Sequence, residues 1–122
     1  MPLHWRADPD GRIAWLVASA PIPELKELQD ALARRGADAD LRARPRVLCD
    51  ARDVPLPTVD YVRTTVTAFL EAAHVAGVER LALVVGGEAA YGMGRMAEVL
   101  VEEVLPLRTF YTTDDARAWL LG

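Results

Sequence analysis

Residues 81–87 read Leu-Ala-Leu-Val-Val-Gly-Gly, five apolar residues closed by two glycines. A continuous apolar run of this kind is typical of a strand that is covered on both faces. Residues 46–50 contain a second such run, Val47-Leu48-Cys49. We therefore predict that residues 46–50 and 81–85 are adjacent parallel strands at the centre of a sheet, sandwiched by amphipathic helices.

Helical patterns follow both strands. A proline-marked loop, residues 54–57, leads to Thr58, which is a suitable N-cap because its hydroxyl can accept one of the unpaired N–H groups at a helix start. A long apolar stripe at helical spacing then continues until near Gly77. Residues 88–104 show the same spacing and stop before Pro106, so they predict a third helix.

The C-terminal segment adds one strand and one helix. Residues 107–112 predict the final strand. Thr113 is the expected cap of a short last helix, whose first turn carries carboxylates that the helix dipole favours. Trp119 and Leu120 are expected to attach this helix to the core.

The N-terminal segment predicts a β-hairpin followed by a helix. Residues 3–7 and 12–18 are short extended runs, and Asp8-Pro9-Asp10-Gly11 between them suits a tight turn. Pro23 fits the first turn of a helix that stops at Gly36, and residues 37–45 have no period and are expected to form a surface loop.

The resulting order is β-β-α-β-α-β-α-β-α, which predicts one α/β domain over residues 1–122. Strands that are joined through helices run parallel with right-handed crossovers, so the sheet should be mixed and mostly parallel, with an N-terminal hairpin and helices packed on it. A chain of 122 residues is large enough for one core.

Composition and local sequence patterns argue against several classes of protein. A formal charge of −4 argues against a nucleic-acid partner, which requires a basic face. Cys49 is the single cysteine, so an intrachain disulfide is excluded. The N-terminal residues lack the pattern of a secretory signal, and no apolar run approaches the roughly 20 residues that a membrane span needs. We expect a cytoplasmic protein without an integral membrane segment.

Two local stretches carry a family resemblance. The first is Leu81-Ala82-Leu83-Val84-Val85 leading through Ala90-Tyr91-Gly92-Met93-Gly94-Arg95-Met96, and the second is Arg108-Thr109-Phe110-Tyr111 followed by Asp114-Asp115-Ala116-Arg117-Ala118-Trp119-Leu120. With the element order, they resemble the SpoIIAA-like family, which has the fold of STAS domains. This resemblance implies a bacterial, regulatory protein that acts by binding other proteins.

The phosphorylation site of the best-known STAS proteins is a serine at the start of the helix after the central strand. The corresponding stretch here, residues 49–58, contains no serine. Thr58 is the residue that could take a phosphate at that helix start, where a dianion meets the positive end of the dipole. Control of a sigma factor therefore does not follow from the resemblance.

Neither the cysteine nor the histidines predict a reactive centre. Cys49 lies within an apolar strand and is expected to act as a small hydrophobic residue of the core. His4 and His74 are far apart in the sequence and have no metal-ligand spacing, so no metal site is expected. His74 is expected near the surface at a helix end.

The other polar motifs also have structural explanations. Asp50, Asp53 and Asp60 could in principle perform acid–base chemistry, but such loops commonly use aspartate for turns and caps. The stretch Gly92-Met93-Gly94-Arg95-Met96-Ala97 is similar to a dinucleotide fingerprint, yet several residues separate it from the preceding strand. We expect its glycines to lie inside a helix, where they permit close packing or a local irregularity.

Any ligand should bind outside the carboxyl ends of the parallel strands, where loops converge and helices begin. Arginines there could bind an anion, and a tyrosine offers a flat apolar face. The candidate ligand-binding residues are Asp50, Arg52, Asp53, Thr58, Gly86, Gly87, Tyr91 and Arg95.

Three functions remain open at this point. The first is a non-catalytic regulatory or protein-interaction module with an unknown protein partner, and the exposed hairpin edge favours a homodimer. The second is a domain that binds a small anionic or lipid-like ligand near Arg52 and Arg95, since the fold also resembles the lipid-binding CRAL-TRIO type. The third is a hydrolase that uses Asp50 and Asp53. We expect no enzyme activity, no catalytic residue and no cofactor.

Overall fold

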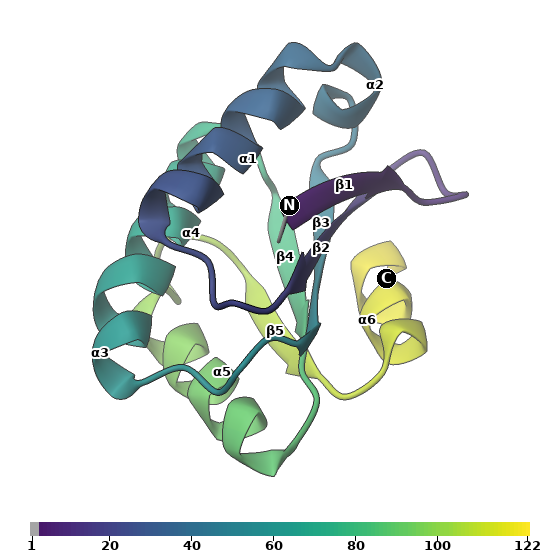
Figure 1. The fold of residues 1–122 in the computed structure, drawn as a ribbon. Coiled ribbons are helices and arrows are strands. Elements are labelled where there is room, and N and C mark those ends of the chain that lie inside the picture. Colours follow the sequence, from purple (N-terminus) through teal and green to yellow (C-terminus); the bar gives the residue numbers. More distant parts are fainter. Residues whose placement is uncertain (1–2) are drawn as a thin grey trace.

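A five-stranded sheet forms the centre of the computed structural model, which describes residues 3–122 (Figure 1). Met1 and Pro2, which the single-domain prediction includes, lie outside the described residues. The strands are β1 (Leu3–Ala7), β2 (Ile13–Ser19), β3 (Arg46–Asp53), β4 (Arg80–Val84) and β5 (Leu107–Phe110), in that spatial order. Only the β1–β2 pair is antiparallel, so the predicted mixed, mostly parallel sheet with an N-terminal hairpin is confirmed. Cys49 is paired with Leu83 in adjacent central strands.

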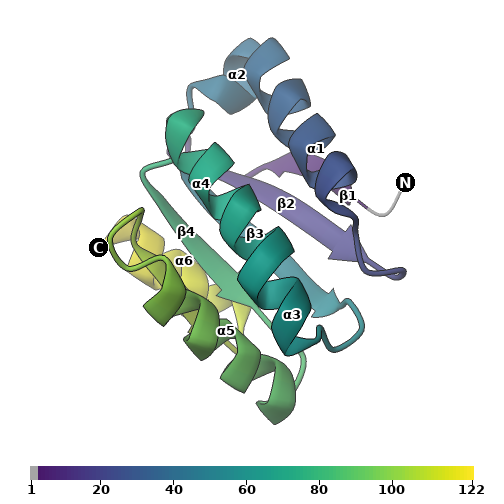
Figure 2. The ribbon, with the colours of Figure 1, turned by 90° about the vertical axis from the view of Figure 1, so that its left-hand side faces the viewer.

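Helices cover the two faces of the sheet unequally. The helical segments are α1 (Leu25–Ala37), α2 (Ala39–Arg42), α3 (Val59–Tyr61), the π-helical turn η1 (Val62–Val66), α4 (Thr67–Val75), α5 (Glu88–Leu100) and α6 (Thr113–Leu121). Figures 1 and 2 show α1, the α3–η1–α4 segment and α5 together on one face, with α6 alone on the other.

Successive strand residues therefore enter two different cores. Val47 and Leu81 pack with the three helices of the larger layer. Leu48 and Ala82, one position further along their strands, pack instead with Leu120 of α6. The continuous apolar runs are required because both faces of these strands are covered.

Two expectations for residues 23–45 were wrong. Helix α1 begins at Leu25, not at Pro23, because Glu24 and Glu27 form a reciprocal capping box at its start. Part of the expected loop is the short helix α2, since the Asp38 side chain accepts hydrogen bonds from the N–H groups of Asp40 and Leu41.

The long helix after β3 starts and ends as predicted. The Thr58 hydroxyl accepts the N–H of Tyr61, and Gly77 adopts φ 92° just after α4. The N–H groups of Gly77 and Val78 donate to His74 and Ala73 carbonyls, which is a Schellman termination. The π-helical turn η1 inside this helix was not predicted.

The last two helices differ from expectation at one end each. Helix α5 stops at Leu100, and residues 101–104 form turns instead of the expected further helical turn. Strand β5 stops at Phe110, because Thr112 is already extended as the N-cap of α6 and accepts the N–H of Asp115. Thr113, the expected cap, is the first helical residue.

Arginines hold helix ends at the amino edge of the sheet. Arg35 is 2 % exposed and donates to the Ala76 carbonyl at the end of α4. Arg46 donates to the Leu120 carbonyl and Arg80 to the Trp119 carbonyl, both in the last turn of α6. Each arginine places a positive charge at the negative end of a helix dipole, which stabilises that helix end.

In each edge strand, one backbone group forms a hydrogen bond with a side chain from a helix. Arg34 of α1 donates to the Leu3 carbonyl of β1 at 3.3 Å. Glu98 of α5 accepts the N–H of Thr109 on β5 at 3.1 Å. Such contacts reduce the capacity of an edge to pair with another chain.

Candidate functional site

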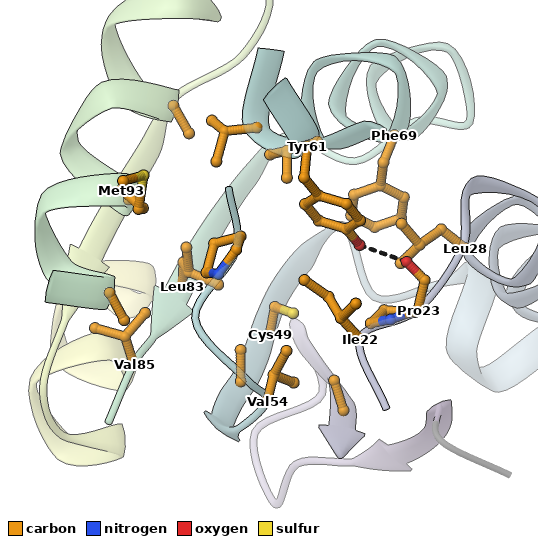
Figure 3. Close-up of a pocket in the computed structure, with 18 of the residues that line it drawn as sticks. Ile22, Pro23, Leu28, Cys49, Val54, Tyr61, Phe69, Leu83, Val85 and Met93 are labelled. Atoms are coloured by element: carbon orange, nitrogen blue, oxygen red, sulfur yellow. Dashed lines mark hydrogen bonds between the residues drawn. The ribbon is translucent and has the colours of Figure 1, made fainter. Parts of the chain in front are cut away.

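An apolar cavity of about 130 Å³ lies between the sheet and the larger helical layer, near the carboxyl ends of β3 and β4. Figure 3 shows its walls, which come from the loop before α1, from β3 and β4, and from the helices above them. Ten of the lining residues are Ile22, Pro23, Leu28, Cys49, Val54, Tyr61, Phe69, Leu83, Val85 and Met93.

The lining carries almost no polar surface. Within residues 3–122, every lining side chain is uncharged, and the polar side-chain groups are the Cys49 thiol and the Tyr61 hydroxyl. The Tyr61 hydroxyl donates to the Pro23 carbonyl, so it is already paired (Figure 3). Burial raises the pKa of Tyr61 to about 12. The cavity therefore presents an environment that favours apolar groups.

Cys49 points its sulfur toward the cavity (Figure 3). Its side chain is partly accessible rather than fully buried, because the packing above β3 is incomplete at this point. Burial, assisted by the negative charge of Asp50, raises the pKa of this thiol to about 12. Cys49 is thus a neutral thiol at physiological pH, and a neutral thiol is a much weaker nucleophile than a thiolate.

The rim of the cavity is built from two loops that touch. Pro55 and Pro57 from the loop after β3 line the cavity, and so does Ala90 in the first turn of α5. At the base of these segments, a Cβ atom on Gly86 would lie 2.6 Å from the Arg52 carbonyl oxygen. Only glycine permits this approach, so the predicted convergence of loops at the carboxyl ends is present.

The acidic and basic candidates on β3 lie away from this cavity. Asp50 alternates with Cys49 and therefore faces the α6 side of the sheet. Arg52 turns toward it and forms a bidentate ion pair, Nε–Oδ1 2.9 Å and Nη2–Oδ2 2.8 Å. Hydrogen bonds from Arg52 are the main cause of the lowered pKa of Asp50, and Arg6 contributes charge from β1.

Tyr91 and Arg95 form a separate group on α5. The Tyr91 ring stacks on Tyr111 after β5, with 4.6 Å between ring centroids. The Nε of Arg95 lies 3.5 Å from Oε1 of Glu98, and its Nη1 donates to the Tyr91 hydroxyl oxygen at 3.5 Å. Since α5 covers the face opposite to Asp50, Arg95 and Arg52 do not form one anion site.

The whole architecture has a match among solved structures. An uncharacterized DUF3478-family protein from Shewanella loihica PV-4, described as having a SpoIIAA-like fold, superposes with a TM-score of 0.63. The match covers 97 % of this chain and 91 % of that chain at 15 % sequence identity. The chain has a SpoIIAA-like fold. No protein-family model matches the sequence, and no curated protein matches it either.

This SpoIIAA-like fold places the remaining candidate residues at the surface. The exposed Thr58 hydroxyl is occupied as the helix cap, and whether it takes phosphate stays a prediction. Asp53 is exposed next to Arg52, and Gly87 is the N-cap residue of α5. Among residues 3–122, no cluster of three potential metal ligands is present, and no helix has the length and apolar character to cross a membrane.

Both glycines of the fingerprint-like stretch lie inside α5, as predicted. Gly94 permits close packing, because a Cβ there would lie 2.5 Å from both Cγ2 and Oγ1 of Thr109. Gly92 faces open space. The SpoIIAA-like fold therefore uses Gly94 for contact between helix and strand.

The cavity itself was missed by the sequence analysis. Its lining residues in the predicted strands and along the apolar helix stripes were expected to fill the core, and Cys49 was included among them. The available signal was the concentration of small and cyclic residues around the strand ends: Ala51, Pro55, Pro57, Ala90 and Gly94. Such residues leave volume unfilled where larger side chains would close it.

Proposed function

We propose that this SpoIIAA-like domain is a non-catalytic binding domain that takes an apolar ligand into the cavity above Cys49. The observation that carries the proposal is an apolar cavity whose lining residues are all uncharged. Empty apolar space forfeits dispersion contacts that a ligand can restore. The position also agrees with the rule that ligands of parallel sheets bind at the carboxyl ends of the strands.

The absence of catalysis is part of the proposal and has its own support. The neutral Cys49 thiol lacks an activating base among the side chains that line the cavity. Asp50, the carboxylate closest to it in sequence, is ion-paired with Arg52 on the other face. These arrangements favour binding over turnover, and they do not support the hydrolase hypothesis.

A thermal-shift titration with toluene tests the proposal. A ligand that binds only the folded state raises the melting temperature in a saturable manner. The blocking variant is Ala90→Phe, which fills the rim, and the matched control is Ala89→Phe on the adjacent exposed position, outside the lining. We expect saturable stabilisation of the wild type and of Ala89→Phe, and its loss in Ala90→Phe.

If neither toluene nor 1-hexanol stabilises the wild type, the binding function is rejected. Equal stabilisation of Ala90→Phe and Ala89→Phe would place the binding site elsewhere on the domain.

A second candidate function, a protein-interaction module, is favoured by one surface observation. Val99 and Leu100 at the end of α5 are 67 % and 45 % exposed. Adjacent exposed apolar residues of this size are a feature of interaction surfaces. Native mass spectrometry of the purified chain, with Val99→Ser and Leu100→Ser as comparisons, tests self-association through this patch, and a monomer at all concentrations would exclude it.

A further inference from the structure

The cavity is suited to a compact, uncharged ligand. We infer that the natural occupant is a neutral apolar molecule about the size of one aromatic ring or a six-carbon chain, and not a fatty acid anion. This inference rests on the proposed function and specifies the chemical class of its ligand. Three independent features support it: the cavity volume, the character of the lining and the charges around the rim.

Volume limits the size of the ligand. The cavity measures about 130 Å³. An engineered protein cavity of about 150 Å³ stays dry and binds benzene, which has six carbons. A ligand of about this size fills the available space, whereas the distal part of a long acyl chain would remain outside.

The lining excludes charge. An ionised carboxylate that enters an apolar site loses its hydration and needs a paired cation or several hydrogen-bond donors in return. The Tyr61 hydroxyl already donates to Pro23, and the remaining polar side chain is the Cys49 thiol, a weak donor. A carboxylate would therefore have to stay at the rim.

Each of three segments at the rim carries a carboxylate. Glu24 follows Pro23, Asp53 precedes Val54, and Glu88 stands two residues before Ala90. All three are exposed, so they add negative charge to the segments that border the cavity, and like charges repel.

Basic residues close in sequence to lining residues at this end of the sheet include Lys26, Arg52, Arg63 and Arg95. The guanidinium of Arg52 is held by Asp50 at 2.8 Å on the other face of the sheet. Arg63 lies on η1 between lining residues Val62 and Val66, and its own side chain is exposed to solvent. Lys26 and Arg95 are also exposed, and Arg95 lies beside Glu98. None of these four residues supplies a buried counter-ion for an anionic head.

The test compares matched ligands by NMR titration of the side-chain methyl groups that line the cavity. The ligands are 1-hexanol, hexanoate and 1-dodecanol at pH 7, added to the wild type and to the blocking variant Ala90→Phe. We expect hexanoate to bind at least about tenfold more weakly than 1-hexanol, since its charge must stay in water. Each buried methylene should raise the affinity of an alcohol roughly fourfold, and this gain should cease beyond about six carbons.

The possible results separate this inference from the proposed function. Hexanoate that binds as tightly as 1-hexanol would overturn the assignment of a neutral ligand while the binding function stands. Affinity that continues to rise by roughly fourfold per methylene up to 1-dodecanol would overturn the size limit. Failure of all three ligands to shift the cavity methyl signals would reject the binding function and this inference together.

Discussion

The carboxylate of Asp8 binds the guanidinium of Arg117 across 109 residues of sequence, with Oδ1 2.9 Å from Nε and Oδ2 3.0 Å from Nη2. The Asp8 side chain is 1 % exposed and also accepts the indole N–H of Trp15 at 2.8 Å. This contact connects the hairpin turn to α6.

Removal of the Asp8 carboxylate should destabilise the domain. Asp8→Ala leaves the buried Trp15 N–H without an acceptor and Arg117 without its partner, which should cost about 2 kcal/mol or more. Urea unfolding followed by circular dichroism measures this loss. The control is Asp10→Ala, which removes the Arg12 partner at the exposed turn and should have a much smaller effect. Equal losses for the two variants would contradict the assignment.

The Asp8 contribution should disappear in acid. Burial opposes ionisation of this carboxyl, but hydrogen bonds from Arg117, the Asp10 N–H and Trp15 outweigh it and lower its pKa from 3.8. A lowered folded-state pKa gives stability that is complete above the unfolded value and is lost as the pH falls through the folded value. The gap in unfolding free energy between wild type and Asp8→Asn should be constant near neutral pH and shrink below pH 3.8.

A matched measurement on Arg117→Met checks that this acid effect belongs to the pair. Its gap from the wild type should shrink over the same pH range, because the neutral Asp8 of acid solution no longer attracts Arg117. A gap that stays constant into acid would show that the pair does not depend on ionisation.

The two glycines of α5 should respond to alanine in opposite ways. Gly94→Ala places a methyl group against the short, buried Thr109 side chain and should cost about 1–3 kcal/mol. Gly92→Ala meets no atom within 4 Å and should gain up to about 1 kcal/mol from helix propensity. Unfolding midpoints in urea distinguish the two results, and stabilisation by both substitutions would mean that α5 can move away from β5.

The Cys49 thiol should be slow to alkylate in the native protein. Its pKa of about 12 leaves little thiolate, and access is through the cavity. Reaction with iodoacetamide at pH 8, followed by mass spectrometry, should be at least about tenfold slower than for the chain unfolded in urea. Similar rates in the two states would indicate that the cavity is open to water.

Periodicity predicted the order of the main strands and helices because burial on alternate faces leaves a pattern in the chain. The errors concern element ends, the short helix α2 and the π-helical turn η1. At a helix start, one side-chain hydrogen bond can decide which residue is the N-cap. Thr112 and Thr113 are adjacent and chemically identical, and the extended backbone at Thr112 makes it the cap of α6. Asp38 likewise nucleates α2 with one carboxylate in a segment without any apolar period.

The candidate site was harder to predict because it depends on the face of the sheet toward which each side chain points. Asp50 and Cys49 are neighbours in the chain, and both lie near the expected strand ends, yet they face opposite sides of the sheet. The cavity depends on incomplete filling between several elements that are distant in sequence, which no local pattern records. The predicted anion site joined Arg52 and Arg95 because both are near carboxyl ends, and the sheet separates them.

The cover of one sheet face by α6 alone has a consequence for synthesis on the ribosome. When a nascent chain has emerged as far as Phe110, all five strands are present, but Ile13, Leu48, Ala82 and Val84 still lack the helix that shields them. Such a chain exposes an apolar surface to the crowded cell, so the newly made protein depends on its final helix for protection from aggregation.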